Sequence, residues 1–99
     1  MPPKFTSPRV NLYQSDAGFS VEVLGRVGLR YVEGDRVMQV DSEVLATPDA
    51  MAMWSSSIVR WDPPDEGVAV TDQERQRIIE NIRLAFESQG YKLEVISRA

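Results

Sequence analysis

A single amphipathic helix over residues 71–89 constrains the fold of this chain more than any other feature of its sequence. Thr71 and Glu74 have the spacing of a capping box, in which the two residues satisfy each other's backbone amides. Gly90 stands where a left-handed C-terminal cap is expected. Apolar residues recur along the helix at three- and four-residue steps, namely Ile78, Ile79, Ile82, Ala85 and Phe86. Because such a stripe has to be buried against another layer, the remaining chain must provide a sheet face.

Apolar and polar residues alternate along most of the chain before this helix and again after it. The alternation predicts four strands in the first half, at about residues 10–13, 19–24, 29–33 and 36–44. Residues 91–96 predict a last strand. We therefore expect an α+β fold, in which an antiparallel β-meander of four to five strands packs on one long C-terminal helix and a final strand follows. The expected architecture is a two-layer sandwich.

A chain of 99 residues is long enough for one hydrophobic core and too short for two. We expect a flexible N-terminal arm at residues 1–8, which contain three prolines, and a single α+β domain at residues 9–97. Residues 47–56 are open to two interpretations, a short helix begun by Thr47 and Pro48, or a turn followed by extended chain. Extended structure is expected to continue to Trp61. The three serines at 55–57 favour a bulge or break there.

Two glycine-containing segments are expected to shape the meander. Gly25 and Gly28 bracket a bend or bulge before the third strand, and Gly34 suits a positive-φ position in a tight turn. The segment around Gly25 is not a phosphate-binding loop, because such a loop needs more glycines and leads directly into a helix.

The sequence contains neither histidine nor cysteine. This excludes disulfides, thiolate nucleophiles, the usual zinc sites and imidazole acid–base chemistry. We expect no enzyme, no catalytic residue, no metal and no cofactor. The chain also lacks an apolar run of membrane-spanning length, and residues 1–7 do not resemble a signal peptide, so we expect a cytoplasmic protein.

The negative charge is concentrated in the middle of the chain. Residues 34–70 carry two basic and seven acidic side chains, whereas the flanking thirds are close to neutral and the formal net charge is −4. An acidic surface repels nucleic acid and favours a basic protein partner. An equally weighted explanation of this negative charge is that it only keeps the protein soluble.

The segment between the meander and the helix holds the candidate partner-binding residues, namely Arg60, Trp61, Asp62, Asp65 and Glu66. Pro63 and Pro64 stiffen this loop, and a stiff loop loses little entropy on binding. Trp and Arg are common at interface hot spots. The alternative is architectural, with Trp61 packed into the core and the prolines ending a strand. The carboxylates lack the spacing of a calcium loop, so a solvated rim is the favoured interpretation of their cluster.

Three segments resemble the bacterial family called immunity protein 74, namely residues 57–64 (SIVRWDPP), 76–83 (QRIIENIR) and 90–95 (GYKLEV). The resemblance extends over about residues 9–96. It implies a small cytoplasmic antidote that binds a cognate toxin of a polymorphic toxin system and blocks it. Many family members have a histidine soon after the prolines, where this chain has Asp65 and Glu66, so the resemblance assigns these two residues no role.

Three hypotheses about function follow. The first is a non-enzymatic immunity protein that neutralises its cognate toxin by steric occlusion, with Trp61 as anchor and the loop carboxylates steering the encounter. The second is a structural or regulatory module that self-associates, for example as a homodimer through an exposed sheet edge. A carboxylate-based hydrolase is the third, and the absence of histidine disfavours it.

Overall fold

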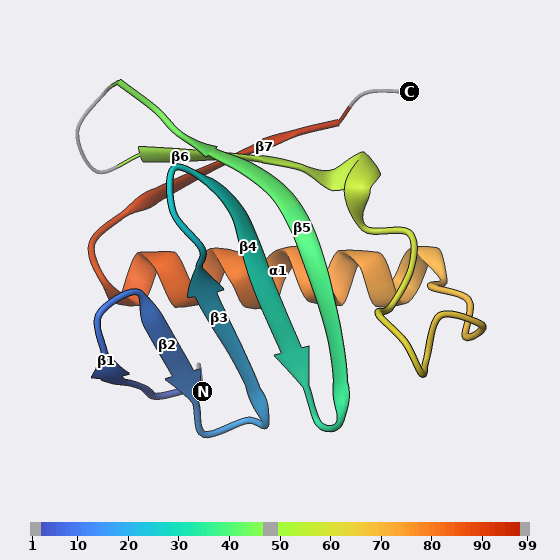
Figure 1. The fold of residues 1–99 in the computed structure, drawn as a ribbon. Coiled ribbons are helices and arrows are strands. Elements are labelled where there is room, and N and C mark those ends of the chain that lie inside the picture. The colour runs from blue at the N-terminus through green and yellow to red at the C-terminus, as the bar shows by residue number, and fades with distance from the viewer. Residues whose placement is uncertain (1–2, 47–49, 98–99) are drawn as a thin grey trace.

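The fold is one seven-stranded sheet curled around one long helix (Figure 1). A computed structural model describes residues 3–46 and 50–97. The strands are β1 (Phe5–Arg9), β2 (Leu12–Ser15), β3 (Phe19–Val23), β4 (Val27–Glu33), β5 (Arg36–Val44), β6 (Ala50–Trp54) and β7 (Lys92–Ile96). Helix α1 spans Asp72–Ser88, and a short 3₁₀ turn spans Ser55–Ser57.

The spatial order of the strands follows their order along the chain. Strands β1 to β6 form an antiparallel meander, and β7 pairs with β6 in parallel, with Met51 opposite Leu93. Neighbouring parallel strands need a crossover connection, and here the crossover contains α1. The predicted α+β architecture of meander, helix and final strand is therefore confirmed, with six strands before the helix.

Helix α1 lies against the concave face of the sheet (Figure 1). Its buried residues are those of the predicted stripe, Ile78, Ile79, Ile82, Ala85 and Phe86. They meet apolar side chains that alternate along the strands, such as Val21, Leu29, Tyr31, Met38 and Val40. Burial of this apolar surface is the main stabilising contribution to the fold. No helix in the described part of the chain has the length and apolar character that a membrane span needs.

The predicted ends of the helix and the predicted bends are also confirmed. The Thr71 hydroxyl accepts a hydrogen bond from the Glu74 amide, and the Glu74 side chain accepts one from the Thr71 amide. Gly90 has φ of 81° and Gly34 has φ of 61°, both in the left-handed region. The register between β4 and β5 shifts between Val27 and Leu29, which is the expected bulge beside Gly28.

The N-terminal region differs from the prediction. Residues 5–8, expected in the flexible arm, belong to strand β1, and Val10 lies in the turn after β1 instead of in the next strand. Strand β1 is an edge strand whose side chains after Phe5 are exposed. Its sequence therefore lacks the alternation of apolar and polar residues from which a strand is predicted. Its Pro8 is tolerated because an edge strand needs hydrogen bonds on one side only.

The prediction for residues 47–56 is tested for residues 50–56, which the structure describes. The helix start considered at Thr47 and Pro48 lies outside the described residues, whereas Ala50–Trp54 are extended in β6. The expected break at the serines is confirmed as the 3₁₀ turn. The extended structure predicted to continue to Trp61 is not found as a strand, and only Arg60 forms an isolated bridge, with Ala69.

Candidate functional site

The loop of residues 58–71 is attached to the core by two buried side chains, Ile58 and Trp61. Trp61 is only 1% exposed. Its ring centroid lies 6.3 Å from that of Tyr31, and the Arg36 guanidinium lies 5.8 Å from it in a cation–π arrangement. Of the two roles considered for Trp61, packing into the core is the one that the structure shows. Its indole is not part of the exposed surface of the loop.

Backbone hydrogen bonds give the loop a defined shape. The Asp62 amide donates to the Val37 carbonyl at 2.7 Å, which joins the loop to the start of β5. The Asp65 amide donates to the Asp62 carbonyl, and the Val68 amide donates to the Asp65 carbonyl, both at 2.9 Å. The loop therefore makes two consecutive turns, and the first of them contains Pro63 and Pro64. Its outer side chains are presented on an ordered backbone.

The side chains of this loop face outward above Trp61. Arg60, Asp62 and Glu66 are exposed and Asp65 is half-buried. None of these four forms an ion pair within residues 3–46 and 50–97. We call Asp62, Asp65 and Glu66 the loop carboxylates. Their charges remain available to a basic partner.

Two other acidic residues at this end of the molecule, Asp72 and Glu33, are already paired with arginines. Asp72 pairs with Arg75 at 2.6 Å, and Glu33 accepts two hydrogen bonds from Arg77, at 2.6 and 3.2 Å. The hydrogen bonds to Glu33 raise the pKa of Arg77 above its ordinary value. The loop carboxylates thus differ from Asp72 and Glu33 in having no cationic side chain of the described residues bound to them.

A polar network beside the loop joins the sheet to the helix. The Tyr31 hydroxyl donates to Glu33 at 2.6 Å and accepts a hydrogen bond from the Asn81 amide at 2.9 Å. Burial, followed by the hydrogen bond to Glu33, raises the pKa of Tyr31 well above its ordinary value. The tyrosine therefore stays neutral at physiological pH, and the network stabilises the fold instead of performing acid–base chemistry.

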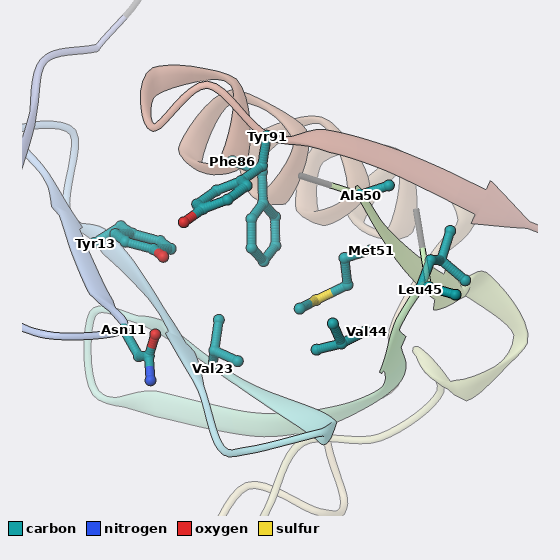
Figure 2. A pocket seen from close by; sticks show the side chains of 10 residues that line it. Asn11, Tyr13, Val23, Val44, Leu45, Ala50, Met51, Phe86 and Tyr91 are labelled. Carbon is teal, nitrogen blue, oxygen red and sulfur yellow. The ribbon is translucent and has the colours of Figure 1, made fainter. Parts of the chain in front are cut away.

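A pocket of about 270 Å³ lies at the other end of α1 (Figure 2). Its lining is mainly apolar and aromatic, and comes from Asn11, Tyr13, Val23, Val44, Leu45, Ala46, Ala50, Met51, Phe86 and Tyr91. The 17-residue helix separates it from the loop by about 25 Å. Sequence reasoning missed this pocket, because its lining comes one to three residues at a time from segments that are far apart in sequence, around β2, β3, the end of β5, the start of β6 and the C-terminal end of α1.

Within the described ranges, the structure brings together no group of three or more acidic side chains that could hold a metal ion. The five predicted site residues are brought into one loop, with four side chains outward and one inward. This arrangement offers a charged contact surface and contains no nucleophile next to a base.

Comparison with known proteins gives one finding. The family model described as immunity protein 74 matches residues 20–96, which include the loop, the helix and β7. No curated protein and no solved structure shows a significant match. Since the family model covers most of the chain, and the resemblance in the loop, helix and last strand agrees with it, this chain belongs to the immunity protein 74 family.

Proposed function

We propose that this protein neutralises a cognate toxin by binding it directly, without catalysis, and that the loop carboxylates contact a basic surface at the toxin's active site. Membership of the family implies immunity against a toxin and hence a toxin partner. The observation that supports the binding surface is the set of three acidic side chains without ion pairs on an ordered loop. An unpaired carboxylate does not have to give up an internal partner when it meets a lysine or arginine.

The loop is suited to rapid and specific association. Its shape is set by one hydrogen bond to β5, by two hydrogen bonds within the loop and by the buried Trp61, so little conformational entropy is lost when a partner binds. The excess negative charge of the middle third of the chain accelerates the approach of a basic surface. In this proposal Trp61 supports the loop from below, and Arg60, Asp62, Asp65 and Glu66 make the contacts.

The test is a triple variant, Asp62→Asn, Asp65→Asn and Glu66→Gln. It is assayed for binding to the cognate toxin, which is sought in the adjacent reading frame and identified by co-purification, and for protection of cells that express this toxin. We expect at least a tenfold loss of affinity, with most of the change in the association rate at low salt. Trp61 is left unchanged because its replacement would test the fold and not the contact.

The matched control neutralises three exposed carboxylates elsewhere, Asp41→Asn, Glu87→Gln and Glu94→Gln. Both triple variants change the formal charge equally, so a loss shared by both would mean that net charge matters and the loop does not. Full protection by the loop variant would contradict the proposed surface.

A second candidate function is self-association through a sheet edge. Strands β1 and β7 end the sheet, so the outer edge of each carries backbone groups that pair with no other described strand. Measurement of molecular mass by size-exclusion chromatography with light scattering separates the two candidates. A monomer that shifts to a heteromeric complex with the toxin supports neutralisation, whereas a stable homodimer without toxin affinity supports self-association.

A further inference from the structure

We infer that the pocket at the C-terminal end of α1 is a second docking site, which takes one aromatic side chain of the partner protein. The inference rests on the proposed function only in taking the partner to be the toxin. We call this pocket the apolar pocket, and its lining was given above (Figure 2).

The size and chemistry of the apolar pocket fit a single aromatic group. Its volume of about 270 Å³ is below the usual range for drug-sized ligands, while a cavity of about 150 Å³ is enough for benzene. Among the described residues, no Asp, Glu, Lys or Arg side chain lines it. Phe86 packs edge-to-face against both Tyr13 and Tyr91, with ring centroids 5.8 and 6.4 Å apart. An additional ring can extend this aromatic cluster.

The hydroxyl of Tyr13 indicates that the occupant has a polar edge. Tyr13 is only 6% exposed, and its hydroxyl, which keeps some contact with solvent, forms no hydrogen bond with another described residue. Figure 2 shows the hydroxyl ends of Tyr13 and Tyr91 directed toward one another at one side of the pocket. Burial and the neighbouring Tyr91 raise the pKa of Tyr13, so its hydroxyl stays protonated. An indole N–H or a phenol hydroxyl of the partner would satisfy it.

Exposed apolar side chains around the pocket favour a polypeptide over a small molecule. Val44 and Tyr91, which line the pocket, are exposed, and Val10, next to the lining residue Asn11, is 82% exposed. These residues lie at the end of β5, before β7 and before β2, all at this end of the sheet. A small molecule inside the pocket would leave them in water. A polypeptide seated over the pocket would cover them, and such patches mark protein interfaces.

The charges beside the pocket add complementarity for a polypeptide. A shallow groove continues from the pocket and shares Asn11, Val23, Val44, Leu45 and Ala46 with it. Arg26 and Glu43 line this groove and form no ion pair with another described residue. The partner segment should therefore place its aromatic residue in the pocket and oppositely charged residues against Arg26 and Glu43.

The first experiment tests the pocket without the toxin. The isotope-labelled protein is titrated with N-acetyl-tryptophanamide, and backbone amide shifts are followed by NMR. We expect saturable shifts at Val23, Ala46 and Met51. Ala46→Phe, at an exposed position on the rim, should weaken this binding at least tenfold, and Tyr13→Phe should weaken it without changing the pocket's shape. Absence of saturable shifts would overturn the inference.

The second experiment measures toxin affinity with Ala46→Phe and with Ala17→Phe, which places the same ring on an exposed turn at the other end of the sheet. We expect Ala46→Phe to weaken binding about tenfold or more and Ala17→Phe to have little effect. Equal toxin affinity of wild type and Ala46→Phe would overturn the inference and leave the proposed function standing, even if the tryptophanamide binds. Failure of the wild type to bind toxin would instead overturn the proposed function.

Discussion

At the scale of single residues, Tyr31 couples the sheet to the helix and makes stability depend on pH. Its hydroxyl lies between Glu33 on β4 and Asn81 on α1. In the unfolded chain its pKa is close to the ordinary value of 10.0, and in the folded protein it is raised, chiefly by burial. Between these two values only the unfolded state loses the proton, so the unfolded state is favoured as pH rises.

We therefore expect the stabilisation by Tyr31 to be fully present below pH 10 and to be lost progressively above it. The free energy of unfolding should fall by up to about 1.4 kcal/mol per pH unit in this range. Tyr31→Phe removes the titrating group, so its curve of unfolding free energy against pH should be flatter between pH 9 and 11. Urea denaturation of both proteins across this range is the measurement. Parallel curves would show that Tyr31 does not titrate differently in the two states.

Two aromatic residues show how much the sequence alone can predict about the surroundings of a single side chain. Trp61 was expected either in the core or on a contact surface, and no local pattern decides between them. Trp61 is buried because Tyr31 and Arg36, which are distant from it in sequence, pack against its indole in the fold. Tyr13 was correctly predicted to lie in a strand. The surroundings of its hydroxyl could not be predicted, because Phe86 and Tyr91 come close to Tyr13 only in the folded structure.

At the scale of elements, the helix could be predicted because all the signals that define it are local. Its cap, stripe and C-terminal glycine lie within 20 residues and were confirmed together. Strand β1 could not be predicted in this way, because an exposed edge strand has no buried face. Its positioning depends on pairing with β2 and on the contact between Phe5 and Phe19, whose ring centroids are 5.7 Å apart.

The capping box gives a prediction for the helix. Thr71→Ala removes the oxygen that accepts a hydrogen bond from the Glu74 amide at 3.1 Å. We expect a loss of about 1 kcal/mol in the free energy of unfolding, and a fall in melting temperature of about 4–8 °C. Thr71→Ser keeps the acceptor and should remain close to wild type in a thermal melt followed by circular dichroism. Equal losses in both variants would assign the effect to the methyl group instead of the cap.

At the scale of the whole molecule, two chemically different surfaces lie at opposite ends of one core. The loop carboxylates lie before the start of α1, and the apolar pocket lies at its C-terminal end. The sequence indicated the first surface, because its residues are contiguous. It could not indicate the second, because the pocket exists only when the curled sheet brings its strand ends around Phe86. Both surfaces keep their geometry only if the sheet and the helix remain packed as a unit.

That requirement leads to a prediction about cooperativity. The buried cluster includes residues of the meander, β6, the loop and α1, so removal of any one layer would expose the apolar surface of the others. We expect a single two-state transition, as in most domains of this size. In a Trp54→Phe variant, fluorescence reports on Trp61 alone and far-ultraviolet circular dichroism reports mainly on α1. The two urea transitions should coincide in midpoint and slope. If the fluorescence of Trp61 changed at a lower urea concentration than the helix signal, the loop would open separately from the core, and the ordered loop carboxylates would lose their fixed presentation.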